Sequence, residues 1–163
     1  MLEIITYPNT VLRKKADAVR NHDGAILKLL GEMADIMYQK DGVGLAAPQV
    51  GISKRIIVVD IGEGLMNLIN PEIVPLTEEK RTAEEGCLSF PGIHVDISRP
   101  ETVTVVGWNE KGEYIEKKTE GLWARVLQHE VDHLNGVLII DHISTIQRAL
   151  LKPKLRKLEK GSV

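Results

Sequence analysis

The sequence predicts an α+β fold with mainly antiparallel strands, and three observations lead to this prediction. Segments rich in β-branched residues cluster in the middle of the chain. Helical patterns lie on either side of that cluster, with a further one near the end. The segments do not alternate as βαβ units, so we expect the strands to pair antiparallel. The length of 163 residues fits one domain, which we expect to cover residues 1–163.

Three segments carry helical signals, and we expect helices at residues 24–40, at residues 122–134 and from Ser144 towards Lys160. The first is expected to end at Asp41-Gly42 and the second at Asn135-Gly136, a typical C-terminal signal. Ser144 is a suitable N-cap for the third helix, which Pro153 is expected to kink or restart.

Short apolar segments between turn residues predict the strands. We expect them at residues 55–60, 65–69, 72–76, 83–90, 102–108 and 113–119, with a last short strand at 137–141. Asn70-Pro71 is expected to form a turn between the second and third strands, and Pro91-Gly92 a turn after the fourth.

Composition and charge exclude several classes of protein. Lys and Arg total 21 against 23 Asp and Glu, a formal charge of −2, so the chain as a whole carries no nucleic-acid signal. The single cysteine, Cys87, excludes an intramolecular disulfide, and the first residues contain no apolar core of signal-peptide length. We therefore expect a cytoplasmic protein with no membrane partner and no sequence-specific nucleic-acid partner.

The strongest chemical signal is the pentapeptide His129-Glu130-Val131-Asp132-His133. On a helix, residues four apart lie one turn apart on the same face, so both imidazoles are able to bind one metal ion. Glu130 follows the first histidine and suits a general base that is not itself a ligand. The alternative is a helix whose histidines are ordinary surface or core residues. Asp132 either orients a ligand or faces solvent.

Two histidines leave a tetrahedral metal site one protein ligand short. Neither of two metalloprotease patterns supplies this ligand. One requires a downstream glutamate, and the only one is Glu159 in the basic tail. The other requires a third histidine, and Ile139 stands in its place. Cys87, in Glu85-Gly86-Cys87-Leu88-Ser89, is the other candidate, and its thiolate would leave one position for water. A lone cysteine is otherwise most often a small buried apolar residue.

The small-residue segment 42–51 is the third signal. It formally contains the dinucleotide-binding pattern G-x-G-x-x-A, but its glycines follow an expected helix rather than a strand, and Pro48 would break the helix that must follow. A loop where a substrate backbone approaches closely is the better interpretation. Gln49 offers an amide donor, a group that stabilises an oxyanion.

Taken together, these segments resemble the peptide deformylase family, which is marked by a GxGxAAxQ loop, an EGCxS strand and an HExDH helix. All three occur in that order, as GVGLAAPQ at 42–49, EGCLS at 85–89 and HEVDH at 129–133. The likeness covers the whole chain and shows no departure in the three motifs. It implies mixed, mainly antiparallel β-sheets packed around a central helix that carries HExxH, with a C-terminal helix.

The resemblance also implies roles for individual residues. Cys87, His129 and His133 would hold one divalent ion per chain, normally Fe²⁺, with Zn²⁺, Ni²⁺ or Co²⁺ able to substitute. The other implied roles are catalytic acid/base for Glu130, oxyanion stabilisation for Gln49 and the backbone N–H of Leu88, and binding of the substrate backbone for Val43 and Gly44. The implied reaction removes the formyl group from the N-terminal formylmethionine of newly made polypeptides, releasing formate.

The residue chemistry agrees with that reaction. A metal ion lowers the pKa of bound water, Glu130 would carry the proton to the leaving amine, and Gln49 with the Leu88 N–H would meet the developing oxyanion. A different metal-dependent amidase or peptidase that uses the same Cys-His-His site is the alternative.

Several residues around the motifs are candidates for substrate specificity or for support of the site. Leu122, Val126 and Val43 are candidates for a methionine pocket, and each is equally compatible with ordinary core packing. Arg125 either borders that pocket with its charge in solvent or is a plain surface arginine. Glu85 either orients donors of the site or lies on a solvated strand. His22, His94 and His142 are expected at the surface.

The C-terminal segment is strongly basic. Residues 148–160 carry a charge of +5, which leaves −7 on the rest of the chain. One interpretation of this segregation is docking on an RNA-rich surface such as the ribosome. The alternative is a solubilising amphipathic helix that packs through its leucines.

Overall fold

The computed structural model describes residues 1–161, so residues 162–163 of the expected domain lie outside it. Three α-helices are present, α1 (Gly24–Gln39), α2 (Gly121–Leu134) and α3 (Thr145–Glu159), with 3₁₀ turns η1 (Thr10–Arg13), η2 (Ala47–Val50) and η3 (Ile139–Asp141). The strands are β1 (Gly44–Ala46), β2 (Ile56–Val59), β3 (Met66–Pro75), β4 (Lys80–Gly86), β5 (His94–Pro100), β6 (Thr102–Trp108) and β7 (Tyr114–Glu120). None of the helices within residues 1–161 is long and apolar enough to cross a membrane.

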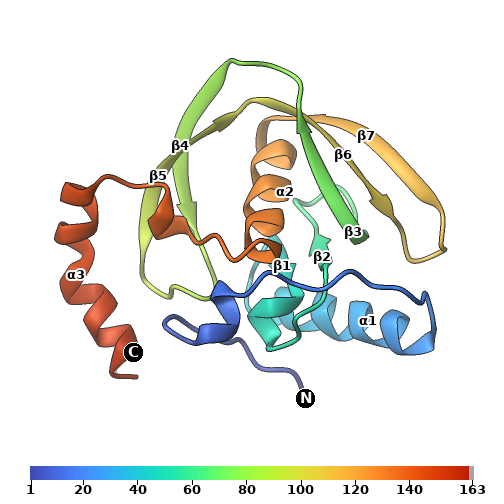
Figure 1. Cartoon of the computed structure of the whole chain (residues 1–163), viewed down its shortest axis with the longest axis horizontal. Helices are drawn as coiled ribbons and strands as arrows, with labels where there is room; N and C mark the ends of the chain where they lie inside the picture. The colour runs from blue at the N-terminus through green and yellow to red at the C-terminus, as the bar shows by residue number, and fades with distance from the viewer. Residues whose placement is uncertain (162–163) are drawn as a thin grey trace.

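The strands form two antiparallel sheets around α2, as Figure 1 shows. One has five strands in the order β1-β2-β3-β6-β7, and the other is the two-stranded ribbon β4-β5. Every pair of named strands is antiparallel, and within residues 1–161 one isolated parallel bridge joins Asp17 and Lys54. The α+β class predicted from the sequence, with a central HExxH helix and a C-terminal helix, is confirmed.

Helix α2 is held by apolar packing on the side that faces the five-stranded sheet. Leu127, Val131 and Leu134 belong to one core cluster with residues of β2, β3 and β6. The same helix buries both histidines and Glu130 of the pentapeptide, all less than a tenth exposed. Because the helix is anchored on its apolar side, the polar side chains on its other faces are fixed relative to both sheets.

The expected break at Asn70-Pro71 is a bulge and not a turn. Strand β3 runs continuously from Met66 to Pro75, and its register against β6 shifts between Ile69 and Glu72. Asn70 adopts a left-handed backbone conformation (φ 52°). Its side-chain amide exchanges two hydrogen bonds of 2.8 Å with the backbone of Val19. The N-terminal segment therefore stabilises the irregularity that the sequence suggested as a chain reversal.

Two expected strands differ from the structure. The segment expected at 83–90 is strand only as far as Gly86, because a tight turn follows in which the Phe90 N–H donates to the Cys87 carbonyl at 2.9 Å. The segment expected at 137–141 ends in the 3₁₀ turn η3, whose Ile139 and Ile140 are buried without a partner strand. Cys87 therefore lies in a turn after a strand.

Helix α3 packs against the segment that follows Cys87. Its Leu155 and Leu158 join a core cluster that includes Phe90 and Ile93. The helix begins after Ser144, whose hydroxyl accepts from the Gln147 N–H, as the N-cap prediction required. Pro153 neither ends nor restarts the helix, which continues through it to Glu159.

Candidate metal centre and active site

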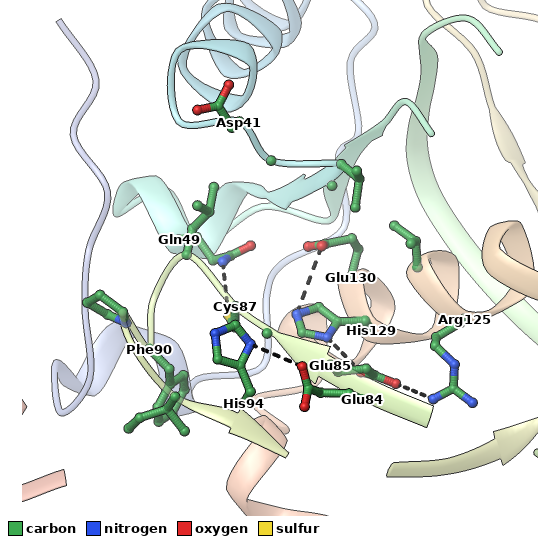
Figure 2. Close-up of a pocket in the computed structure, with 18 of the residues that line it drawn as sticks. Asp41, Gln49, Glu84, Glu85, Cys87, Phe90, His94, Arg125, His129 and Glu130 are labelled. Carbon is green, nitrogen blue, oxygen red and sulfur yellow. Dashed lines mark hydrogen bonds and ion pairs between the residues drawn. The ribbon is translucent and has the colours of Figure 1, made fainter. Parts of the chain in front are cut away.

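A cavity of about 420 Å³ lies between β1, the turn after β4 and one face of α2. Figure 2 shows the polar side chains that converge on it from these elements. Seven of the eight residues assigned a role from the sequence motifs line the cavity wall. The eighth is His133, whose Nε2 lies 3.3 Å from the Cys87 Sγ. The structure therefore brings together three segments that are more than thirty residues apart in the chain.

Cys87, His129 and His133 form a cluster of three possible metal ligands. One ligand atom from each residue lies within 4.8 Å of the other two. The Cys87 Sγ is 3.3 Å from the His133 Nε2, and the two imidazole rings are 5.1 Å apart between centroids. One sulfur and two imidazole nitrogens are a donor set that divalent zinc and iron accept, with a further position left for solvent.

The polar environment of this cluster also fits a cation. Burial favours a neutral His129 ring, yet its hydrogen bonds to Cys87 and Glu85 raise the pKa of His129 well above its ordinary value. Burial lowers the pKa of His133 well below its ordinary value, and the charge of His129 adds to this effect. Without a metal ion, these surroundings favour a proton on His129 and a neutral His133 ring, and a bound cation would take the place of that proton.

Glu85 orients the first imidazole. Its Oε1 lies 2.9 Å from the His129 Nδ1, which leaves the Nε2 of that ring for a metal ion. Arg99 donates to both carboxylate oxygens, at 2.6 and 2.9 Å. Although burial alone raises the pKa of Glu85, hydrogen bonds from His129 and Arg99 lower it to about 2. Of the two interpretations of Glu85, the structure therefore supports the orienting one, because its side chain is only 5% exposed.

Both sequence interpretations placed the charge of Arg125 in solvent, and the structure contradicts both. Its Nη1 donates to the Glu85 Oε2 at 2.6 Å and to the Ile97 carbonyl at 2.9 Å. Its Nη2 donates to the Arg81 carbonyl at 2.6 Å, so both terminal nitrogens of the guanidinium donate to protein groups. Arg125 does line the cavity, so its expected position at the border of the pocket holds.

Glu130 lies beside the cluster with one oxygen free. Its Oε1 is 4.0 Å from the His129 Nε2, and its Oε2 is buried with no hydrogen-bond partner within residues 1–161. Burial raises the pKa of Glu130 to about 7. A carboxyl with such a pKa accepts and returns protons near neutral pH.

Gly44 makes room for that carboxylate. A Cβ atom at position 44 would lie 2.5 Å from the Glu130 Oε1 and 2.9 Å from the Glu130 Cγ and Cδ. Strand β1 therefore packs its bare backbone against the Glu130 side chain. β1 is an edge strand paired only with β2, and Gly44 and the exposed Val43 line the cavity.

Gln49 points its amide nitrogen towards the cysteine. Its Oε1 accepts from the Ala46 N–H at 2.9 Å, which fixes the orientation of the amide. The Nε2 then donates to the Ser89 Oγ at 3.2 Å and approaches the Cys87 Sγ at 3.5 Å. Leu88, the next residue after the cysteine, lines the same cavity. Leu122 and Val126 also line it, as expected for the candidate apolar pocket.

The residues outside these motifs differ in how well the sequence predicted them. Asp132 does not face solvent freely, since it accepts from Arg99 at 2.9 Å and contacts the His142 Nε2 at 2.8 Å. His94 is largely exposed as expected, but it lies at the cavity wall, 3.9 Å from Glu84. Arg99 was missed, and the only signal for it is its inward position in the alternation of β5.

The comparisons with known proteins agree with this geometry. A family model described as polypeptide deformylase matches residues 1–149. The chain belongs to the peptide deformylase family. A peptide deformylase of Thermotoga maritima is 52% identical over 155 residues, which is 95% of this chain and 94% of that relative.

Solved structures of the family share the fold. The crystal structure of the Thermotoga maritima enzyme superimposes with a TM-score of 0.86 at 53% identity, covering 88% of this chain and 98% of that one. A Legionella pneumophila peptide deformylase gives a TM-score of 0.91 at 40% identity, covering 98% and 96% of the two chains. The enzyme from Synechococcus elongatus, solved in complex with actinonin, gives 0.89 at 41% identity over 96% and 85%.

Proposed function

We propose that this chain is a single catalytic domain that removes the formyl group from the N-terminal formylmethionine of new polypeptides by metal-dependent hydrolysis. Membership of the peptide deformylase family makes the chain a hydrolase of N-formyl peptides. The observation that carries the mechanism is the convergence of one thiol and two imidazoles beside a buried carboxyl whose second oxygen has no partner in the described chain.

The family and the three donors together indicate a divalent metal ion. We propose that Cys87, His129 and His133 hold it, one ion per chain, and that the native ion is Fe²⁺, for which Zn²⁺, Ni²⁺ or Co²⁺ substitutes. When bound, the ion supplies Lewis acidity that makes a water molecule acidic enough to attack an amide at neutral pH. Metal analysis of protein purified without oxygen tests the identity of the ion, and a large excess of zinc over iron would contradict it.

Glu130 moves the proton. Its unpartnered Oε2 accepts a proton from the attacking water, and a pKa of about 7 lets the carboxyl return that proton to the leaving amine. The formyl carbon carries only a hydrogen beside its oxygen and nitrogen.

Two donors stabilise the oxyanion in this proposal. The Gln49 amide is held with its nitrogen towards Cys87, because its oxygen is fixed by the Ala46 N–H. The backbone N–H of Leu88 is the second donor. Removing one oxyanion donor typically costs about 3–4 kcal/mol of barrier, so Gln49→Leu is expected to lower kcat more than a hundredfold.

The substrate backbone is proposed to bind along the free edge of β1 at Val43 and Gly44. An extended peptide pairs with an exposed strand edge through main-chain hydrogen bonds, which do not depend on its sequence. Leu122 and Val126 line the same cavity and offer apolar contacts to a methionine side chain.

Glu130→Gln is the decisive test of the mechanism. It preserves the shape of the side chain and removes the proton acceptor, so we expect at least a hundredfold loss of turnover on formyl-Met peptides with metal content unchanged. Glu84→Gln, a carboxylate more than two-thirds exposed at the cavity rim, is the matched control and should retain activity. Retained activity in E130Q would show that another group is the base. Cleavage of internal bonds in unformylated peptides would instead support the peptidase alternative.

We further propose that the protein acts in the cytoplasm and docks on the ribosome through α3. The helix exposes Ile146 and Leu150 together with its basic side chains, while Leu155 and Leu158 are buried. Deleting the helix would therefore uncover core residues, so charge reversal of Lys152, Lys154 and Lys157 is the cleaner test. We expect weaker co-sedimentation with ribosomes and unchanged turnover of small peptides. Equal binding by both forms would contradict the docking proposal.

A further inference from the structure

Arg125 connects three separate parts of the protein from its position on α2. Its guanidinium reaches the carbonyls of Arg81 on β4 and Ile97 on β5, and it also contacts the Glu85 carboxylate. The side chain is only 12% exposed, although it lies at the cavity wall. Figure 2 shows it extending from the helix to Glu85 beside the histidine. A buried arginine with this many partners is held in one conformation.

The strands that Arg125 contacts are the two partners of the β4-β5 ribbon. Arg81 is opposite Arg99, and Ala83 is opposite Ile97, in the register of the ribbon. Cys87 comes directly after β4, whereas both histidines of the cluster lie on α2. The contacts of Arg125 therefore bridge the element that ends in the thiol and the element that carries the imidazoles.

Arg125 also completes the set of donors around Glu85. The Oε1 of this carboxylate contacts the His129 Nδ1 and the Arg99 Nη2, while the Oε2 accepts from the Arg99 Nε and the Arg125 Nη1. Four donors thus fix both oxygens in place. Without Arg125, the Oε2 would retain only Arg99, and the carboxylate could rotate away from the His129 ring.

We propose that Arg125 is a positioning residue that sets the separation between the Cys87 thiol and the two imidazoles and keeps Glu85 aligned on His129. The inference rests on the proposed function, since it assumes that these three residues bind a metal ion. Without Arg125, the β4-β5 ribbon and α2 would be free to move apart. The three ligands would then lose their mutual geometry, so the ion would dissociate faster. Partners that orient metal ligands typically contribute 10–100-fold to affinity.

The test measures Co²⁺ dissociation from the loaded protein. Wild type, Arg125→Gln and Arg125→Lys are loaded with Co²⁺, mixed with excess chelator and followed through the thiolate-to-cobalt charge-transfer absorption. Arg81→Gln is the matched control, because its side chain lies on the same ribbon but is 72% exposed. We expect R125Q to release Co²⁺ at least tenfold faster with a weaker charge-transfer band, R125K to release it at least threefold faster, and R81Q to match wild type.

Each outcome decides between a positioning role and a merely structural one. If folded R125Q lowers the melting temperature but releases Co²⁺ within twofold of wild type with an unchanged band, Arg125 is only structural and the inference is overturned. If R125Q does not fold, R125K decides by the same comparison. If wild type itself shows no thiolate band with Co²⁺, the proposed metal site fails and the inference fails with it, so the two failures are distinguishable.

Discussion

Replacing Gly44 with alanine tests how tightly the general base is held. The new Cβ would lie 2.5 Å from the Glu130 Oε1, and nonbonded atoms need about 3.5 Å. The carboxylate would therefore have to move by about 1 Å. Glu130 is only 4% exposed and belongs to a helix packed on the five-stranded sheet, so β1 and the side chain must share that movement.

The size of the effect follows from that displacement. A shift of about 1 Å in a reacting group costs on the order of a hundredfold in rate, and general acid–base catalysis as a whole contributes about 10²–10⁴-fold. We expect Gly44→Ala to lower kcat on a formyl-Met peptide about a hundredfold. Metal content should remain unchanged, because the three atoms nearest to the new Cβ all belong to Glu130 and not to a proposed ligand.

A double-mutant cycle isolates the contact. Glu130→Asp shortens the side chain by one methylene, so it withdraws the atoms that the new Cβ would meet. We expect Gly44→Ala to cost less than tenfold in the E130D background, which is a large departure from additivity. Gly31→Ala is the control, since a Cβ there meets nothing within 4 Å. Activity of G44A within threefold of wild type, or an equal cost in both backgrounds, would refute the reasoning.

Two further predictions concern the ligand cluster and its support. Cys87→Ser replaces a thiolate with a poorly ionising hydroxyl, so metal content after dialysis should fall at least tenfold, and an unchanged content would contradict ligation. Glu85→Gln should destabilise the protein at neutral pH but not in strong acid. The folded-state pKa of Glu85, about 2, lies below its ordinary value, so its contribution of about 3 kcal/mol is present above pH ~4.5 and is lost as the pH falls towards 2. Denaturant unfolding of E85Q and wild type in EDTA at pH 7 and pH 2.5 measures the difference in their free energy of unfolding. A difference that does not become smaller in acid would disprove the prediction.

The sequence predicted the residues of the site better than it predicted what supports them. The cluster of Cys87, His129 and His133 follows from helical spacing, an incomplete coordination number and motif resemblance, and the structure brings their ligand atoms together. The sequence left Glu85 and Arg125 each with two interpretations, a role at the site or a solvated position, because a charged residue next to a motif is usually solvated. Only tertiary packing shows that these charges lie less than an eighth exposed and neutralise one another.

Strand β5 shows why part of the fold was missed. Its residues alternate between exposed and buried positions, but the third buried position is Arg99, where an apolar residue would normally mark the pattern. A charge at an inward position hides a strand from any hydrophobicity criterion. In the same way, Asn70 carries a turn signal, yet its side chain bonds to Val19 from the distant N-terminal segment, and the strand continues. Both errors come from partners that local sequence does not contain.

The two ends of the described chain meet over the segment that follows Cys87. Tyr7 stacks on Phe90 with ring centroids 5.1 Å apart, and its hydroxyl donates to Glu159 at the end of α3, while Leu155 and Leu158 cover the same cluster. Tyr7 and α3 come from opposite parts of the chain, and both pack on the turn that follows the thiol. The packing of this turn is therefore complete only when both segments are in place.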